Sequence, residues 1–576
     1  MSTVIKGIGA SPGIAIGPAW IYRPIKVEVR TISNSDPITE QLRLDSALME
    51  SKKQLEDLHI RTLAMVGEEE AAIFQAHAMV LEDPEFIDTV KKIIREKRIN
   101  AEPAVQEGVE HYANMLLALE DEYFQARAQD IQDVGRRIIQ CLSGAGKGQN
   151  TNPPFPVVIA AEELYPSDTV QFDKKVILGF CTIKGGPTSH VAIMARSLGV
   201  PAIVSAPFVL EEIEEESILI INGGDGTVVI KPDENEIRTA KKNQQDLEDK
   251  SAVQFASTHE PAVTTDGVAV EIVANIGSAD DARIAVEYGA EGVGLLRTEF
   301  LYMDRTALPT VDEQIKIYRE IFEAMGDRPV VVRTLDIGGD KSVPYLGLQK
   351  EDNPFLGWRA IRMVSERPEV LEQQFSALLQ AGEKSDLRIM IPMISNIDEV
   401  INAREMLEKV KEYLLRKGIP VPQKLQYGIM VEVPSAVMQV SEISDYVDFF
   451  SIGTNDLTQY TVAVDRGNER VANLASPFHP AVIRLIHKTI TDAHAKGKWV
   501  GLCGEMAGDP LAAPLLLGLG LDEFSMAHTS IPCIKYLMRM LDKSECEKIA
   551  IEALTLPSIA AVKNYMIEIN RKMDIC

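Results

Sequence analysis

The C-terminal half of the sequence repeats one pattern, a short apolar run of strand length followed by a stretch of helical text. Eight such runs follow one another from about Pro261 onwards: 270–277, 292–299, 330–336, 388–394, 427–433, 448–456, 499–505 and 522–526. Eight strand–helix units in about 315 residues are what a TIM barrel requires. The pattern favours a (β/α)8 barrel, with an open doubly wound sheet as the alternative.

Polar and charged side chains recur where these predicted strands end. Taken in chain order, they are Arg297, Glu299, Arg333, Asp336, Glu432, Asn455, Asp456, Cys503 and Glu505, with Arg466 in the loop after the sixth strand. In a TIM barrel the active site lies at the C-terminal ends of the strands. Any one of these groups could be an ordinary surface residue, but their repetition strand after strand indicates a binding site.

The residue types at these strand ends indicate the chemistry of the ligand. Two carboxylates, Glu432 and Asp456, form a sparse oxygen site that suits Mg²⁺. The guanidinium groups of Arg297, Arg333 and Arg466 offer paired donors to phosphate and carboxylate groups. We therefore expect a substrate that is small, multiply anionic and metal-chelating.

A second candidate site lies at His190, within the stretch from Lys184 to Arg196. Two glycines follow an apolar strand at 175–180, a Thr-Ser pair is placed to cap a helix, and His190 falls in the first helical turn. Backbone N–H groups and the helix dipole favour an anion there, and an imidazole nitrogen is a nucleophile at neutral pH. The sequence thus predicts a histidine that carries a phosphoryl group, although a lone histidine can also simply cap or pack.

The segment Gly-Gly-x-Thr-Ser-His-x-Ala-Ile-x-Ala-Arg, at 185–196, resembles the phosphohistidine signature of the phosphoenolpyruvate-utilising enzymes. Further motifs of that family follow in the same order: GAEGVGLLRTEFLYMDR, RTLDIGGDK, NPFLGWRAIR, SIGTNDLTQYTVAVDR and LCGEMAGD. The family includes pyruvate phosphate dikinase, phosphoenolpyruvate synthase and enzyme I of the bacterial sugar phosphotransferase system. The resemblance covers nearly all 576 residues and is strongest to enzyme I.

The resemblance implies a role for each matching residue. Phosphoenolpyruvate would be the substrate, Mg²⁺ the cofactor, and His190 the tele-phosphohistidine intermediate. Cys503 would protonate the enolate carbon, although an isolated cysteine can also be a core residue. The implied substrate-binding residues are Arg297, Arg333, Arg359, Asn455, Asp456 and Arg466, and the implied metal ligands are Glu432 and Asp456.

The residue pattern of the N-terminal half, and with it the predicted secondary structure, changes twice. Residues 1–22 and 144–232 read as short strands and turns, whereas 23–143 is dominated by charged helical text with apolar residues at spacings of three and four. We expect a phosphohistidine α/β domain with an inserted helical subdomain.

The resemblance implies that the helical subdomain docks the phosphocarrier protein HPr. Acidic positions Glu68, Glu69, Glu82 and Asp83 could face such a basic partner. His77 could contribute to docking or be a surface histidine.

Residues 233–260 predict a helix with almost no apolar stripe, typical of a linker between domains and also of an ordinary surface helix. Residues 261–576 would form the phosphoenolpyruvate-binding barrel, which the resemblance makes a homodimerisation domain. His190 precedes Arg297 by about 107 positions and is predicted in another domain, so we expect a swivelling N-terminal half with its hinge at 233–262.

Charge and composition exclude several partners. The 85 acidic and 59 basic residues give a net charge of -26, which disfavours nucleic acid and anionic membranes and suits a basic protein partner. No signal peptide and no run of 18 apolar residues is present, and six scattered cysteines fit a reducing compartment without a zinc site. A cytoplasmic protein is expected.

Two other functions remain as alternatives. A dikinase or synthase would need a further nucleotide-binding domain, and nothing in residues 1–150 resembles one. A binding protein on a barrel that has lost catalysis would lack His190, Cys503 or an arginine, and all are present. The sequence does not identify the sugars served. The lack of an extra sensory domain favours the sugar-uptake HPr over a nitrogen-regulation paralogue.

Overall fold

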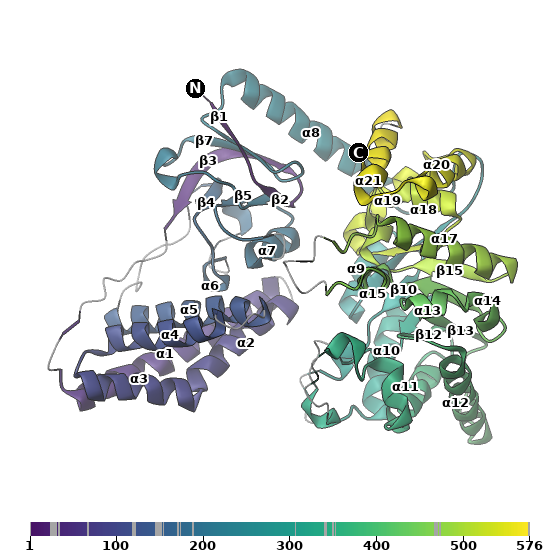
Figure 1. Cartoon of the computed structure of the whole chain (residues 1–576), viewed down its shortest axis with the longest axis horizontal. Helices are drawn as coiled ribbons and strands as arrows, with labels where there is room; N and C mark the ends of the chain where they lie inside the picture. Colours follow the sequence, from purple (N-terminus) through teal and green to yellow (C-terminus); the bar gives the residue numbers. More distant parts are fainter. Residues whose placement is uncertain are drawn as a thin grey trace. The chain divides into compact units, whose positions relative to one another are not determined.

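The computed structural model divides the chain into two compact units, Met1–Asp249 and Lys250–Cys576 (Figure 1). It describes residues 2–573 except 24–30, 33, 34, 66, 67, 118–121, 145–152, 154, 170, 171, 173, 187, 188, 304, 306, 339–342, 348–350, 352, 466–470, 472 and 473.

The first unit contains an eight-stranded mixed sheet with the strand order β1-β8-β7-β3-β4-β5-β6-β2. Strands β3 to β6 of this order pair in parallel, and the other neighbours are antiparallel. The strands are β1 (Thr3–Lys6), β2 (Ile8–Ser11), β3 (Ile14–Tyr22), β4 (Val157–Ala161), β5 (Ile177–Thr182), β6 (Ala202–Val204), β7 (Ile218–Asn222) and β8 (Thr227–Ile230). Short helical segments join them: α6 (Pro166–Thr169), η1 (Lys174–Val176), α7 (His190–Leu198) and η2 (Leu210–Glu212).

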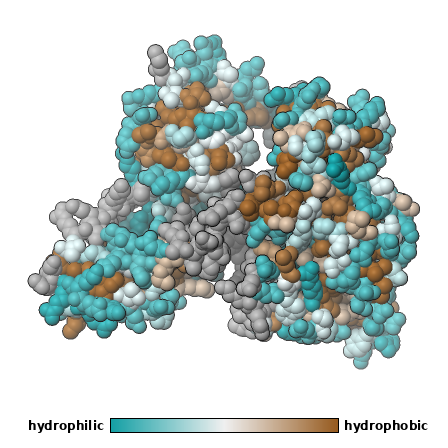
Figure 2. All heavy atoms as spheres, viewed as in Figure 1, coloured by the Kyte–Doolittle hydropathy of each residue, from teal (hydrophilic) through white to brown (hydrophobic). Residues whose placement is uncertain are grey.

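Among the described residues, five helices lie between β3 and β4, which confirms the predicted helical insertion. They are α1 (Pro37–Met65), α2 (Glu68–Glu82), α3 (Pro84–Lys97), α4 (Ala101–Leu117) and α5 (Glu122–Ser143). Their buried side chains, such as Phe74 and Ile94, belong to the same apolar cluster as Ile159 of β4 and Val191 of α7. The insertion is therefore packed onto the α/β part through a shared core, while its face seen in Figure 2 is mostly hydrophilic.

Helix α8 (Glu234–Ala256) follows β8 and crosses from the first unit into the second. Most of its side chains are exposed, as its lack of an apolar stripe predicts.

The second unit is a closed barrel of eight parallel strands, so the predicted TIM barrel is confirmed and the open sheet is wrong. The strands are β9 (Glu271–Ile276), β10 (Val293–Leu296), β11 (Val330–Arg333), β12 (Asp386–Ile391), β13 (Lys424–Val431), β14 (Phe449–Ile452), β15 (Trp499–Leu502) and β16 (Glu523–Met526). Residues Glu523 to Met526 pair in parallel with Glu271 to Ala274, which closes the ring. Each strand corresponds to one of the eight apolar runs in the sequence.

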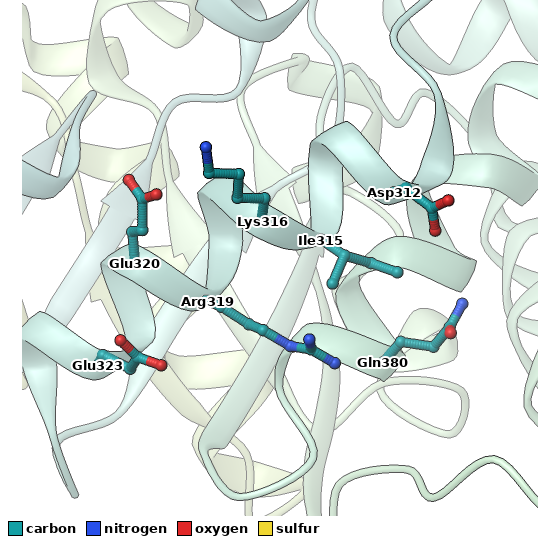
Figure 3. Close-up of a pocket in the computed structure, with 7 residues that line it drawn as sticks. All are labelled: Asp312, Ile315, Lys316, Arg319, Glu320, Glu323 and Gln380. Atoms are coloured by element: carbon teal, nitrogen blue, oxygen red, sulfur yellow. The ribbon is translucent and has the colours of Figure 1, made fainter.

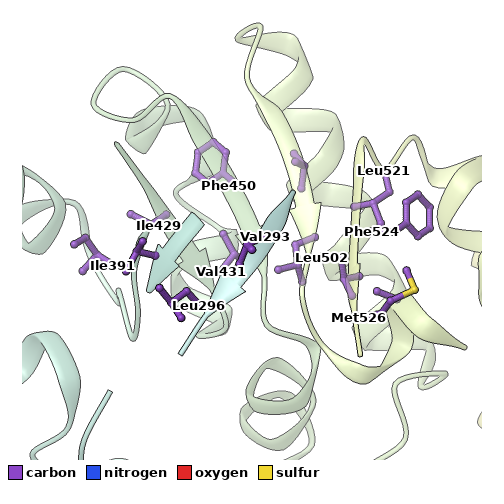
Figure 4. Packing of buried hydrophobic residues seen from close by; sticks show 14 of the residues in the cluster. Val293, Leu296, Ile391, Ile429, Val431, Phe450, Leu502, Leu521, Phe524 and Met526 are labelled. Atoms are coloured by element: carbon purple, nitrogen blue, oxygen red, sulfur yellow. The ribbon is translucent and has the colours of Figure 1, made fainter. Parts of the chain in front are cut away.

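Helices cover the outside of this barrel. The longer ones are α9 (Ala279–Glu287), α10 (Val311–Met325), α11 (Pro368–Ala381), α12 (Ile397–Arg416), α15 (Thr454–Val462), α17 (Pro480–Ala495), α19 (Ile531–Met538), α20 (Lys543–Thr555) and α21 (Ile559–Lys572). Shorter helical turns are η3 (Glu299–Leu301), η4 (Pro344–Leu346), η5 (Pro354–Leu356), η6 (Ala360–Ser365), α13 (Pro434–Val437), α14 (Val440–Ile443), η7 (Glu505–Gly508), α18 (Ala513–Leu519) and η8 (His528–Ser530). Alternate strand residues such as Ile429, Val431 and Phe450 point outward into the apolar layer beneath these helices (Figure 4).

A smaller cluster fills the inside of the barrel. It consists of Leu295, Val331, Met390, Met430, Phe449 and Cys503. The inside of the barrel is thus a packed apolar core and not a channel. No helix in the described part of the chain is long and apolar enough to cross a membrane.

Candidate active site

Arg333, the last residue of β11, is held by two buried carboxylates. Its Nη2 donates to Oε1 of Glu299, the first residue of η3, and its Nη1 lies 3.0 Å from Asp336 Oδ2. Burial alone would lower the pKa of Arg333, but the charges of Glu299 and Asp336 raise it above the ordinary value. The guanidinium therefore remains a fixed cation at the barrel rim, and its Nε is buried without a partner among the described residues.

Arg359 connects the third and sixth strand ends. Its Nε donates to Asp336 Oδ1 at 2.7 Å, and its Nη2 donates to Asp336 Oδ2 at 2.9 Å and to Asp456 Oδ2 at 3.0 Å. Gly338 makes this approach possible, because its φ is +114° and a Cβ there would lie 2.8 Å from the Arg359 Cα. The RTLDIGGDK motif thus supplies both the carboxylate and the close backbone contact that position Arg359.

Glu432, at the end of β13, and Asp456, in the first turn of α15, form a buried acidic pair. Glu432 Oε1 accepts a 2.7 Å hydrogen bond from Met393 N. Burial, with the neighbouring charges of Asp456 and Asp336, raises the pKa of Glu432 to about 8. Asp456 Oδ1 is buried and has no hydrogen-bond partner within the described ranges.

These two carboxylates fit a divalent cation, which would compensate the charge that burial penalises. Within the described ranges no group of three or more His, Cys, Asp or Glu side chains is placed to hold a metal. Two carboxylates alone are a sparse set of oxygen donors, which hard divalent cations tolerate because water and substrate can supply further ligands.

Cys503 directly follows β15 and belongs to the apolar cluster inside the barrel, at the C-terminal ends of the strands. It is 6% exposed, its Sγ lies 3.7 Å from Ile452 O, and it packs in the cluster with Val331 and Met430. Burial raises its pKa to about 11, despite the opposing charge of Arg333. The side chain is therefore a protonated thiol at neutral pH, able to donate a proton at the strand ends.

The other predicted rim residues differ in their surroundings. Asn455 Nδ2 donates to Glu505 Oε1 at 3.3 Å. Arg297 is exposed at the end of β10, and its guanidinium makes no ion pair with the described residues. Arg466 lies outside the described residues.

One neighbour of these residues was not anticipated from the sequence. Tyr460 accepts a 3.3 Å hydrogen bond from Arg359 Nη1 and donates to Phe355 O at 2.6 Å. It lies four residues, or one helical turn, after Asp456 in the SIGTNDLTQY motif. Residues four apart on a helix share a face, so this spacing could have indicated that Tyr460 lies beside Asp456.

His190 is the first residue of α7, with Ser189 at the N-cap position in an extended conformation. Ser189 takes the N-cap position that the sequence predicted, but its side chain makes no capping bond, and Thr188 lies outside the described residues. The Nε2 of His190 is buried and has no hydrogen-bond partner in the described structure. Burial and the nearby His77 lower the pKa of His190 to about 4, against the effect of Asp130 and Asp133. The ring is therefore neutral and nucleophilic at physiological pH.

His77 lies on α2 and has no exposed surface, so its interpretation as a surface histidine is wrong. Its Nε2 lies 3.2 Å from Asp130 Oδ1 on α5. Asp133, one turn further along α5, accepts from Ser167 Oγ at 2.6 Å and from Arg136 Nη2 at 3.1 Å. Of the other acidic positions predicted to meet HPr, the side chains of Glu68 and Glu69 lie outside the described residues.

A groove of about 520 Å³ lies on the outer surface of the barrel, along α10 beside α11. Figure 3 shows its lining, in which Lys316 and Arg319 lie between Asp312 at one end and Glu320 and Glu323 at the other. It contains none of the strand-end residues and is separate from the site.

A TIM barrel with arginines and buried carboxylates at its strand ends defines an enzyme that handles a small anionic substrate. Family models agree: "PEP-utilising enzyme, N-terminal" matches residues 6–127, "PEP-utilising enzyme, mobile domain" matches 153–226, and "PEP-utilising enzyme, PEP-binding domain" matches 251–543.

The curated relatives are similar over almost the whole chain. The phosphoenolpyruvate-protein phosphotransferase of Geobacillus stearothermophilus is 46% identical over 564 residues, covering 98% of this chain and 97% of that protein. Those of Bacillus sp. (strain S) and Bacillus subtilis (strain 168) are 45% and 44% identical, each over 98% of this chain and 97% and 99% of the relative. The chain belongs to the phosphoenolpyruvate-protein phosphotransferase family of PEP-utilising enzymes.

Proposed function

We propose that this chain is enzyme I of a phosphoenolpyruvate-dependent sugar phosphotransferase system. It takes the phosphoryl group of phosphoenolpyruvate onto His190, passes it to a histidine of HPr and releases pyruvate, which is the first step of sugar uptake. The observation that carries the proposal is the buried, unpartnered Nε2 of a neutral His190 in a chain that also has the arginine and carboxylate network of the barrel rim.

Phosphoenolpyruvate binds at the strand ends of the barrel. Arg297 and Arg333 contact its phosphate, because one guanidinium is exposed and the other is a buried cation with an unpartnered Nε. Arg359, fixed by Asp336, supports them. Asn455, the backbone of Asp456 and Arg466 complete the pocket.

Glu432 and Asp456 would hold Mg²⁺, which would supply neutralisation of the substrate's negative charge. The chain keeps these two oxygen donors in place through Met393 N and Arg359.

In the transfer, the P–O bond of phosphoenolpyruvate breaks and an N–P bond forms at Nε2 of His190, while the bonding electrons remain on the enolate. Cys503 then gives its proton to the methylene carbon, which yields pyruvate, and the thiolate regains a proton from solvent. Its raised pKa keeps the thiol protonated until the enolate forms.

His190 and the strand-end residues belong to different units of the chain, so the phosphohistidine domain must swivel to reach both donor and acceptor. Residues 233–260 serve as the linker. Residues 1–22 and 144–232 form the phosphohistidine domain, 23–143 dock HPr, and 261–576 bind phosphoenolpyruvate and form a homodimer in the cytoplasm.

The decisive experiment incubates the chain with phosphoryl-labelled phosphoenolpyruvate and Mg²⁺, with and without HPr. The wild type should acquire acid-labile label and pass it to HPr, and His190→Ala should acquire none because it lacks the accepting nitrogen. His487→Ala, an exposed histidine on α17, is the matched control and should label normally. Acid-labile label retained by His190→Ala would overturn the assignment.

A further inference from the structure

Tyr460, on α15, bonds to two parts of the strand-end site, yet the proposed reaction gives it no role. Its hydroxyl has a single proton, which it donates to Phe355 O at 2.6 Å. A lone pair of the same oxygen accepts from Arg359 Nη1 at 3.3 Å. The hydroxyl also lies 3.9 Å from Met393 Sδ. One hydroxyl thus connects the segment that precedes Arg359 with the guanidinium of Arg359.

The protein already uses most of the donors of Arg359. A guanidinium has five N–H groups, one on Nε and two on each Nη. The N–H of Nε and one N–H of Nη2 bind Asp336, and the other N–H of Nη2 binds Asp456. On Nη1, one N–H binds Tyr460. The second N–H of Nη1 has no partner among the described residues, so Tyr460 holds the arm of the guanidinium that carries the remaining donor.

The backbone on two sides of this contact is strained. Ala360, directly after Arg359, has a φ of +53°, and Met393 has a φ of +59°. Residues other than glycine keep this left-handed conformation only where the surrounding structure holds them, and they are found mainly at functional sites. The bond from Tyr460 to Phe355 O is one contact of this kind, because it fixes the segment that leads into Arg359.

The remaining N–H of Arg359 lies where an anionic ligand can use it. Arg359 is only 6% exposed, and a guanidinium binds phosphate more strongly where little water competes. Its Nη2 binds Asp456 Oδ2, whereas Asp456 Oδ1 is buried and has no partner within the described ranges. A metal-chelating anion that binds at Asp456 therefore lies beside Arg359.

We propose that Tyr460 is a positioning residue, which holds Arg359 so that the remaining N–H of Nη1 binds the phosphate of phosphoenolpyruvate. This inference rests on the proposed function, because it requires phosphoenolpyruvate to bind at these strand ends. Tyr460 acts through Arg359 and contacts no reacting atom. Its loss should therefore weaken the binding of a ligand that has the phosphate and spare a ligand that lacks it.

The test measures binding without phosphoryl transfer. The parent is the full-length chain with His190→Ala, which removes the proposed acceptor, and titration calorimetry with Mg²⁺ gives the Kd of two ligands. One is phosphoenolpyruvate, and the other is oxalate, a dianion that resembles the enolate of pyruvate without the phosphate. Tyr460→Phe removes only the hydroxyl. It should raise the Kd of phosphoenolpyruvate about tenfold, the effect of losing a hydrogen bond to a charged group, and change that of oxalate less than about twofold.

Two further variants complete the experiment. Tyr413→Phe, which changes an exposed tyrosine on α12, is the matched control and should leave both Kd values unchanged. Arg359→Lys keeps the charge but lacks the planar fork, so the donor that Tyr460 holds is absent. In that background, Tyr460→Phe should change the Kd of phosphoenolpyruvate less than about twofold.

An unchanged Kd of phosphoenolpyruvate in Tyr460→Phe would overturn the inference. An equal rise for both ligands would also overturn it, because Tyr460 would then only maintain the fold of the pocket. A tenfold effect of Tyr460→Phe in the Arg359→Lys background would show that Tyr460 does not act through Arg359. If the parent chain bound no phosphoenolpyruvate, the proposed function itself would fail, and that result is distinct from the others.

Discussion

Asp336 determines much of the rim chemistry, because one carboxylate holds two arginines. It binds Arg359 through both oxygens and lies 3.0 Å from Arg333. A lone buried carboxylate would take up a proton, and a lone buried arginine would be strongly unfavourable, but the network satisfies both. The arginines are therefore oriented before a substrate arrives, which reduces the entropy lost on binding.

Another buried carboxylic acid lies at the N-terminal ends of the barrel strands, opposite the strand ends that hold Asp336. Glu523, the first residue of β16, lies 3.4 Å from Arg388 on β12, and Arg388 also lies over the Trp499 ring at 4.9 Å. Burial, with the charges of Glu271 and Asp522, raises the pKa of Glu523 to about 8. The folded state therefore binds a proton that the unfolded chain releases near pH 4.5.

This linkage predicts that barrel stability decreases as the pH rises from about 5 to about 8, by about 1.4 kcal/mol per pH unit at most. Glu523→Gln should abolish this part of the slope and be more stable than the wild type at pH 8. Urea unfolding followed by tryptophan fluorescence measures both. Glu405→Gln, on the exposed face of α12, should keep the wild-type slope, and an equal slope in Glu523→Gln would contradict the prediction.

At the scale of elements, helices α4 and α5 approach closely because α5 has a glycine where they meet. A Cβ at Gly135 would lie 2.3 Å from Cγ2 of Val109. In an exposed helix, glycine costs about 1 kcal/mol relative to alanine, so its presence here is explained by packing. The contact helps to fix the helical insertion that carries His77, Asp130 and Asp133.

Gly135→Ala should therefore destabilise the first unit by about 1–3 kcal/mol, despite its better helix propensity. Val109→Ala removes the clashing methyl groups, so the double variant should recover part of that loss. A double-mutant cycle by thermal denaturation checks this coupling. Strictly additive effects would show that the two side chains do not clash.

The strands of the barrel were predictable because each buried strand is a short apolar run. The helical insertion was predictable because its apolar residues recur at spacings of three and four, which is the period of a helix. The strand-end positions followed from the same pattern, since Arg333, Glu432 and Cys503 lie near the C-terminal ends of such runs. His77 was not predictable as a neighbour of His190, because 113 positions separate them and only the shared core brings α2 and α7 together. The bond between Tyr460 and Arg359 also depends on tertiary geometry, as does the bond between Met393 and Glu432.

At the scale of the whole molecule, the chain consists of two units with separate sheets, each with its own core. Such units are expected to unfold in separate transitions. The proposed ligands bind residues of the barrel, so they stabilise that unit alone by mass action.

Calorimetry of the full chain should therefore show two transitions. Mg²⁺ with a non-transferable phosphoenolpyruvate analogue should raise the midpoint temperature of the barrel transition. At a ligand concentration of a hundred times Kd, the free energy of unfolding of the barrel should increase by about 2.7 kcal/mol. The Arg333→Ala variant should lose this response while retaining two transitions. A single transition, or an equal rise of both, would contradict the division.

Ring closure in the barrel joins β9 to β16, strands that are about 250 residues apart in the chain. During translation, the ring cannot close until the ribosome has released residue 526, whereas the sheet of the first unit is complete once β8 has emerged. The earlier unit can therefore mature while the later one waits as open, incompletely paired strands. Chaperones that recognise nascent polypeptides would accordingly be needed mainly for the second half of synthesis.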